Sequence, residues 1–447
     1  MKKFFTTLSN IWKIDDLRVR ITNTLLFLLI YRVGSFVVLP GVNSASLNNQ
    51  QNKEGLTGLL NMFAGGSFSR ASIFALGVMP YISASIVVQL LGIAVPYFAK
   101  LQKEGESGRN KLNQWTRYLT IGITALQAIG YLRSQISVDQ MQISNPYFTV
   151  LNMCVLTAGT MFIMWLGEKI TDKGIGNGIS LIIMVGIIAA LPAAFAGEFT
   201  ARTTGAGGLV TFIVEIVGLI GVVMFTILIV QGTRKIAVQY AKRIVGNKQY
   251  GGVRQYIPLK VNAAGVMPII FAQALMFIPA TLQQFFPKSA SNPILMSLGN
   301  IYSWGHNLLF AVLIIVFTYF YTAITVNPNQ MAEDMKKNGG FIPGIKPGRS
   351  TAEFIDGVIS RITLPGSIFL AIIAIFPALA SLVGVSTQFS RFFGGTSLII
   401  LVGVVLDTLQ QIESHLLMRH YDGLMKTGRI KGRTSISSAG GTSQPVI

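Results

Sequence analysis

Apolar runs of about the length needed to cross a membrane recur ten times along the chain and alternate with polar segments. A helix needs about 20 consecutive apolar residues to cross the hydrocarbon core of a bilayer. The pattern therefore predicts an all-α integral membrane protein with ten transmembrane helices. The predicted spans are residues 21–39, 77–95, 118–132, 150–166, 179–196, 209–230, 266–285, 308–326, 362–383 and 397–417.

The ten spans divide into two sets of five. A set with an odd number of spans is inserted upside down relative to its partner, which is the inverted-repeat arrangement of many transport proteins, with the working site between the halves. The halves share no convincing sequence identity, so this symmetry rests on the count of spans. We expect a terminal segment over 1–20, an N-terminal half over 21–200, an external hinge over 201–208, a C-terminal half over 209–417 and a tail over 418–447.

Composition supports a membrane protein, and the basic residues give its orientation. Hydrophobic residues make up 51% of the chain and charged residues only 12%, against about 25% charged in soluble proteins. Of the 36 Lys and Arg residues, 29 fall on the side of the N-terminus and 6 on the other, while Arg32 lies within the first span. Basic loops stay in the cytoplasm. Both termini and the large loops are therefore expected to be cytoplasmic.

Two of the cytoplasmic loops, 231–261 and 327–361, are too long to be simple connectors. The first contains seven basic residues and no acidic one, and the second is mixed in charge and rich in Gly and Pro. Long loops are usually functional, and an all-basic projection indicates a docking surface for an acidic or polyanionic partner. The alternative is that both loops only set the membrane topology.

Enzyme chemistry is not indicated. The chain has no Walker phosphate loop, no Gly-x-Ser-x-Gly elbow and no His-Glu-x-x-His motif. Its single cysteine, Cys154, excludes an intramolecular disulfide and a cysteine-based zinc site, and we predict no catalytic residue, metal or cofactor. An inverted-repeat solute carrier remains an alternative function, although such carriers usually place several ionisable groups at mid-membrane, where this chain has chiefly Arg32 and Asp407.

The segment 59–74, LLNMFAGGSFSRASIF, is apolar but too short to cross a bilayer. Its small residues permit close packing against other helices, and we expect a short half-helix that enters from the external side. Irregular backbone at membrane depth is tolerated only inside protein or beside a water-filled cavity. The segment therefore predicts such a cavity, and the alternative is a buried structural hairpin.

Six sequence runs carry a resemblance to a known family. They are NMFAGGSFSRASIFALGVMPYISASIVVQLL (61–91), KEGESGRNKLNQWTRY (103–118), TAGTMFIMWLGEKITDKGIGNGIS (157–180), LKVNAAGVMPIIFA (259–272), NPNQMAEDMKKNGGFIPGIKPG (327–348) and FGGTSLIILVGVVLDT (393–408). These runs closely resemble the SecY family, the channel subunits of the bacterial Sec protein translocon, and the resemblance covers roughly residues 16–432. It implies two inverted halves around an hourglass pore, an external plug helix, a lateral gate open to lipid, and residence in the bacterial cytoplasmic membrane.

The resemblance also assigns residues to the pore, by motif position. Without it, the six aliphatic residues of the ring would be interpreted as ordinary core packing. The ring of apolar side chains at the constriction falls on Val78, Ile82, Ile175, Ile179, Ile270 and Ile400. The plug falls on residues 61–72, with Asn61, Phe63, Gly65, Gly66, Ser67, Arg70 and Ser72. The lateral gate, between spans two and three and spans seven and eight, carries Ser83, Ser85, Gln89 and Gln273.

The function that the resemblance implies is a passive protein-conducting channel. Such a channel translocates unfolded preproteins and releases signal sequences and membrane helices into the membrane lipid, driven by the ribosome or by the SecA motor ATPase. SecE, SecG, insertase and accessory factors are further expected partners. The docking candidates are Lys242, Arg243, Lys346 and Arg349. Lys346 stands where many members have arginine, which keeps the charge but loses the bidentate fork.

Overall fold

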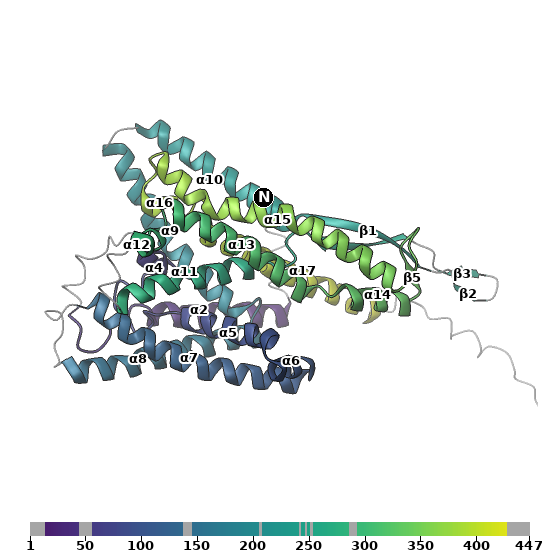
Figure 1. Cartoon of the computed structure of the whole chain (residues 1–447), viewed down its shortest axis with the longest axis horizontal. Helices are drawn as coiled ribbons and strands as arrows, with labels where there is room; N and C mark the ends of the chain where they lie inside the picture. The colour runs from purple at the N-terminus through teal and green to yellow at the C-terminus, as the bar shows by residue number, and fades with distance from the viewer. Residues whose placement is uncertain are drawn as a thin grey trace, which may run out of the picture.

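The computed structural model describes residues 14–43, 56–136, 145–204, 208–240, 243–245, 248–250, 254–285 and 293–426. Long helices lie roughly side by side, and a small β-sheet projects from one end of them (Figure 1). We call this end the sheet end. The opposite end, where the short helices α4 (Leu56–Phe63), α12 (Pro293–Gly299) and α16 (Thr387–Ser390) lie, is called the far end.

Each predicted span falls on one long helix. The N-terminal half contains α2 (Asp15–Gly34), α5 (Met79–Ala94), α7 (Glu106–Gln135), α8 (Asn145–Lys173) and α9 (Gly178–Thr204). The C-terminal half contains α10 (Gly208–Gln231), α11 (Met267–Phe285), α13 (Trp304–Thr325), α15 (Arg349–Leu382) and α17 (Gly395–Lys426). In Figure 1, α2, α5, α7 and α8 form the lower part of the bundle, and α10, α13 and α15 form the upper part.

Length and apolar composition support a multi-pass membrane protein. Among the described residues, six helices are long and apolar enough to cross a membrane alone, namely α8, α9, α10, α13, α15 and α17. The pair α5 and α6 (Pro96–Lys103) passes the same test only when the two helices are counted together, and it is bent by 104° at the break between them. Charged residues lower the hydropathy of α2 and of the first turns of α7, so these helices are recognised by their place in the bundle.

Several helix ends differ from the ends of the apolar runs. α7 begins at Glu106 and α15 begins at Arg349, each about three turns before the predicted span, because a helix continues through polar residues once it has left the bilayer. α2 ends earlier than predicted, at Gly34. The chain then turns and pairs with residues 71–73 through hydrogen bonds from Leu39 N to Ala71 O (2.8 Å) and from Ile73 N to Val37 O (2.9 Å).

The two long loops, which the sequence analysis treated separately, join in one β-sheet. Strand β1 (Thr233–Tyr240) pairs antiparallel with β4 (Arg254–Lys260) and with β5 (Gly340–Phe341), while β2 (Arg243–Val245) and β3 (Lys248–Tyr250) form a separate hairpin. The sheet packs on α14 (Pro328–Lys337) and the start of α15. Its core consists of Ile236, Val238, Leu259, Met335, Ile342 and Ile355. The sheet end is therefore a folded unit and not a pair of independent loops.

A buried ionic cluster ties the halves together at the far end. Arg202 of α9 donates hydrogen bonds to the carboxylates of Glu198 and Glu215 and to the carbonyl of Gly384. Glu198 also accepts a hydrogen bond from the Ser386 amide at 3.1 Å. The two glutamates are 1% and 7% exposed. Helix α9 ends at Thr204 and so includes the first residues of the predicted hinge 201–208. Residues 205–207 of this hinge lie outside the described residues.

Arg202→Gln should lower the thermal unfolding midpoint markedly, because it leaves two buried carboxylates without their shared cation. Breaking a buried ion pair from one side typically costs about 3–5 kcal/mol. The measurement is the melting of the purified protein in detergent. Arg133→Gln is the matched control, because Arg133 is exposed near the end of α7. Equal midpoints for the two variants would show that the cluster contributes nothing to stability.

Candidate functional site

An apolar cavity lies where the two halves meet. The cavity is small, with a volume of about 20 Å³, which holds roughly one water molecule. The walls come from the chain between α4 and α5 and from α5, α9, α11 and α17. The lining residues are Phe63, Ala64, Leu76, Gly77, Val78, Met79, Ile82, Ile183, Ile270, Gln273, Thr396 and Ile400. Since none of them is charged, the cavity offers a passing ion almost no replacement for its water.

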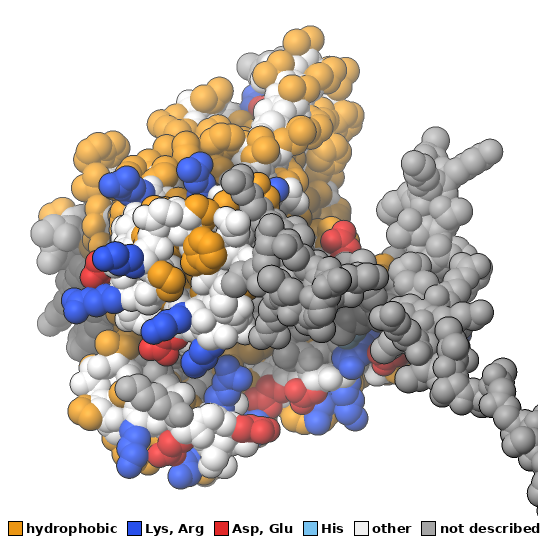
Figure 2. Space-filling view, turned by 90° about the vertical axis from the view of Figure 1, so that its right-hand side faces the viewer, with side chains coloured by type: hydrophobic (Ala, Val, Ile, Leu, Met, Phe, Trp, Pro, Cys, Tyr) orange, Lys and Arg blue, Asp and Glu red, His pale blue; other side chains and the backbone are white. Residues whose placement is uncertain are grey.

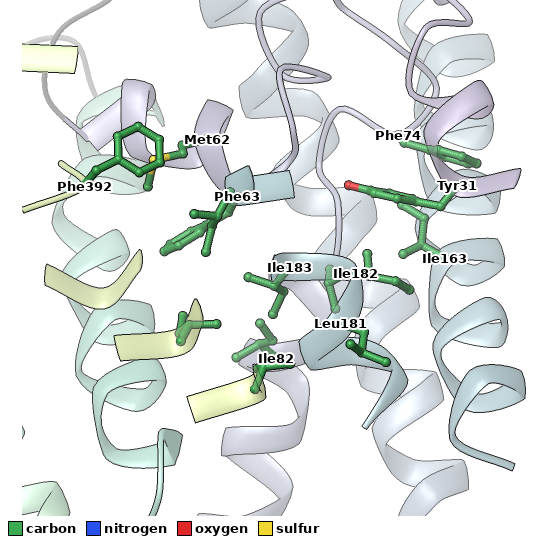
Figure 3. Packing of buried hydrophobic residues seen from close by; sticks show 14 of the residues in the cluster. Tyr31, Met62, Phe63, Phe74, Ile82, Ile163, Leu181, Ile182, Ile183 and Phe392 are labelled. Carbon is green, nitrogen blue, oxygen red and sulfur yellow. The ribbon is translucent and has the colours of Figure 1, made fainter. Parts of the chain in front are cut away.

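Four of the six predicted ring residues line this cavity: Val78, Ile82, Ile270 and Ile400. Val78 and Ile82 come from the start of α5, and the other two come from α11 and α17 of the opposite half. In Figure 3, Ile82 lies beside Ile183, with Phe63 above both. The structure thus brings these residues from separate segments to one place.

Ile175 and Ile179 do not line the cavity, and Ile183 does. α9 begins only at Gly178, so Ile175 precedes this helix and Ile179 lies in its first turn. The amide of Ile175 donates to the Thr24 hydroxyl of α2 at 3.1 Å. Ile179, Ile183 and Ile187 repeat at four-residue intervals and so share one face of α9. The spacing of these isoleucines therefore predicts the face of α9 that points to the cavity, but not which of its turns lines the cavity.

The segment 56–78, which we call the α4–α5 segment, forms one helical piece followed by turns. Helix α4 ends at Phe63, because Gly65 and Gly66 adopt φ values of +62° and +85° that glycine tolerates best. The sequence predicts a half-helix over 59–74, whereas helix α4 covers only the beginning of this segment. Asn61 fixes the turn, since its side-chain oxygen accepts from the amide and the hydroxyl of Ser69, and its carbonyl accepts from the Gly66 amide.

The α4–α5 segment packs directly against neighbouring helices. A Cβ atom added to Gly186 of α9 would lie 2.5 Å from the Phe63 carbonyl oxygen, so the close approach requires glycine at this position. Tyr131 of α7 donates a hydrogen bond to the Phe68 carbonyl at 2.7 Å. Ser67 and Ser72 are fully buried. The segment is therefore an inserted part of the core.

Arg70 and Arg32 both hold the turn at Gly65 by donating hydrogen bonds to its carbonyl. Ser72 forms an isolated β-bridge with Val38, next to the hydrogen bonds that follow α2. All seven residues predicted for the plug thus lie in the α4–α5 segment, two of them in helix α4 and five in the turns that follow it.

The predicted gate residues lie on facing helices of the two halves. α11 packs against both α5 and α7. Ser83 donates to the Met79 carbonyl, and Gln89 donates to the Ser85 hydroxyl. Gln273 of α11 lines the cavity, and its amide nitrogen is buried without a hydrogen-bond partner. Among the described residues, no hydrogen bond joins Gln273 to the polar residues of α5.

The sheet end carries the predicted docking residues that the structure describes. Lys346 and Arg349 are exposed there, and Arg349 pairs with Glu353 at 3.2 Å. Arg243 lies in strand β2, and Lys242 lies outside the described residues. Figure 2 looks onto this end and shows Lys and Arg side chains spread across it, with some acidic side chains among them, whereas hydrophobic side chains cover the flank above.

Together these features define a multi-pass membrane protein whose two halves meet at an apolar constriction. The family model SecY matches residues 72–409. The protein translocase subunits SecY of Streptomyces scabiei and Halalkalibacterium halodurans are each 44% identical to the chain, over 94% of its length and 100% of their own. The chain therefore belongs to the SecY family, which is a protein translocation channel family and not a known enzyme family.

Solved structures support the same ten-helix fold. The chain is similar to "The structure of a protein conducting channel", with a TM-score of 0.65 and 18% identity over 93% of this chain and 95% of that one. A second similar structure concerns the plug domain of a SecY protein, with a TM-score of 0.61 and 17% identity over 93% and 95% of the two chains. Sec61 from the canine ribosome–channel complex has a TM-score of 0.62, at 17% identity and the same coverage.

Gly186→Ala should loosen the α4–α5 segment, because the added methyl group collides with the Phe63 carbonyl. We expect faster amide hydrogen exchange across residues 56–78. Gly197→Ala is the matched control in the same helix, since a Cβ atom there meets nothing within 4 Å and the gain in helix propensity is the same. Equal exchange in the two variants would contradict the close approach between α9 and the segment.

Proposed function

We propose that the protein is a passive protein-conducting channel, which passes unfolded preproteins across the membrane and releases signal sequences and membrane helices sideways into lipid. The observation that carries this proposal is the apolar cavity formed jointly by both halves and the α4–α5 segment. The naming of its relatives as translocase subunits supports it. The cavity lining contains no titratable side chain, which argues against the alternative of an ion-coupled solute carrier.

The cavity wall is the constriction that seals the channel. Its ring in this proposal consists of Val78, Ile82, Ile183, Ile270 and Ile400, with Ile183 in place of Ile175 and Ile179. An ion in such a ring loses water without gaining a partner, which costs tens of kcal/mol by ideal solvation estimates. An extended polypeptide can instead push flexible aliphatic side chains aside. The ring thus blocks ions while it yields to protein.

The α4–α5 segment is the plug of this channel. Phe63 and Ala64 contribute directly to the cavity wall, so displacement of the segment would open the wall on one side. The hydrogen bonds that hold it come mainly from α2 and α7 of its own half. A polypeptide that reaches the cavity can therefore displace the segment without separating the two halves.

The lateral gate is the contact of α11 with α5 and α7. A signal sequence is an apolar helix, and its transfer to lipid is worth about 0.8 kcal/mol for each buried CH₂ group. The unpartnered amide of Gln273 adds a cost to the closed gate, because a buried donor without an acceptor is unfavourable. An opened gate gives this amide access to water or to substrate backbone, so the cost favours opening.

The sheet end faces the cytoplasm and forms the docking surface for the ribosome and the SecA motor. Its sheet makes a rigid base beside Lys346 and Arg349, and rigid cations suit the phosphate-rich RNA of the ribosome. The proposal adds Arg243, in the separate hairpin of β2 and β3, and Lys242, which lies outside the described residues. Structures related in fold are described as ribosome-bound. The proposal includes the bacterial cytoplasmic membrane, cytoplasmic termini, an external hinge at 201–208, and SecE, SecG and accessory insertion factors as partners.

Replacing Ile82, Ile183 and Ile270 together with Ser should make the idle channel leak ions, because hydroxyl groups can hydrate an ion where aliphatic groups cannot. Planar-bilayer conductance is the measurement. The matched control replaces Ile82, Ile179 and Ile270, so only the α9 position differs. Residues that merely pack would instead leave cavities, with a loss of stability of a few kcal/mol at each site and no conductance. Equal leakage from both triple variants would overturn the assignment of Ile183.

Lys346→Glu should weaken ribosome binding while leaving the fold intact, because this side chain is exposed. We expect a several-fold rise in the dissociation constant at low salt and a steep loss of wild-type binding as salt increases. Arg133→Glu at the far end is the control for the change in net charge. Binding that is insensitive both to salt and to Lys346→Glu would rule out docking through this lysine.

A further inference from the structure

Two arginine side chains converge beside the proposed plug. Arg32 lies in the last turn of α2, and Arg70 lies in the α4–α5 segment. One guanidinium nitrogen of each donates to the Gly65 carbonyl oxygen at 2.8 Å. The two nitrogens are therefore no more than twice this distance apart. The guanidinium carbons also lie 4.9 and 4.3 Å from the centroid of the same Phe36 ring.

Among the residues that the structure describes, no carboxylate balances the charges of this arginine pair. Among the described residues, the ion pairs involve other arginines, and none joins a carboxylate to Arg32 or Arg70. The Nε atom of Arg70 is buried without a hydrogen-bond partner. A single carbonyl oxygen supplies only a partial negative charge to two cations that repel each other. The geometry therefore leaves room for an anion that accepts from both.

The position of the pair indicates where that anion comes from. α2 has 20 residues and spans about 30 Å, which is close to the thickness of the hydrocarbon core. The other charged residues of α2 lie in its first two turns, so Arg32 in its last turn lies in the far-end half of the membrane. Around it, Val33, Phe36 and Val37 are 60%, 55% and 49% exposed, as expected for side chains that face lipid tails. The two guanidinium groups therefore border lipid on the far-end side, where the headgroups of that leaflet are the nearest source of phosphate.

We propose that Arg32 and Arg70 bind the phosphate of a phospholipid headgroup in the far-end leaflet. Guanidinium groups match phosphate oxygens in charge and in geometry, and two nitrogens at this spacing can be bridged by one phosphate. The bound phosphate neutralises the repulsion between the arginines, so both can stay on the Gly65 carbonyl. Lipid binding at this site thereby strengthens the attachment of the α4–α5 segment, whether or not the protein conducts polypeptides.

Native mass spectrometry of the purified protein with added phosphatidylglycerol tests the site. The wild type should retain one lipid more tightly than either Arg32→Gln or Arg70→Gln, with at least a tenfold difference in dissociation constant for that lipid. Arg133→Gln removes one far-end positive charge elsewhere and should leave it unchanged. Arg70→Lys keeps the charge but loses the fork, and should weaken binding by an intermediate amount.

Amide hydrogen exchange tests whether the bound lipid stabilises the α4–α5 segment. Phosphatidylglycerol should slow exchange over residues 64–70 in the wild type and not in Arg70→Gln. Equal lipid retention by the wild type and by both glutamine variants would overturn the proposal. Full competition by millimolar glycerol phosphate would also overturn it, by assigning the site to a soluble anion. A glutamine variant that melts early is replaced by Arg70→Lys, whose retention must then fall below that of the wild type.

Discussion

The structure depends on one constraint, which is that irregular backbone at membrane depth must find its hydrogen bonds inside the protein. In the α4–α5 segment, side chains from the surrounding helices supply these hydrogen bonds. Tyr131 donates to the Phe68 carbonyl, and Arg32 donates to the Gly65 carbonyl. Gly186 makes the close approach sterically feasible. These contacts place Phe63 and Ala64 in the wall of the central cavity. In the proposed channel, the seal thus depends on a hydrogen-bond network that holds the resting segment and lies mostly within its own half.

The two halves are joined differently at different depths. At the far end the buried Arg202 cluster holds α9, α10 and the chain around Gly384 together. In the middle, apolar side chains surround a cavity, and Gln273 keeps an unpartnered amide. A strong tie at one end and weak contacts beyond it favour a rocking motion of one half against the other. The helices of the proposed gate, α5, α7 and α11, contact one another where this motion would separate the halves.

Much of this fold could be predicted from the sequence, because apolar runs of spanning length mark membrane helices directly. The short run with Gly65 and Gly66 likewise marked the inserted segment. Ile183 was missed because the isoleucines of α9 repeat once per turn, and periodicity identifies the face of a helix but not its depth in the membrane. The joining of the two loops was missed because β5 has only two residues and its residues pair with residues of β1 that lie 100 and 102 positions away. Such a pairing leaves no local pattern.

The central claim is that the α4–α5 segment closes a pore at the apolar ring. Ala64 and Ile400 come from this segment and from α17, and both line the cavity. Ala64→Cys and Ile400→Cys, in a chain with Cys154→Ala, can be joined by a short, cleavable dithiol linker. The decisive measurement is preprotein transport into vesicles that contain the linked protein. Our account predicts that transport stops when the linker is in place and returns when it is cleaved, whereas undiminished transport through the linked protein would contradict it.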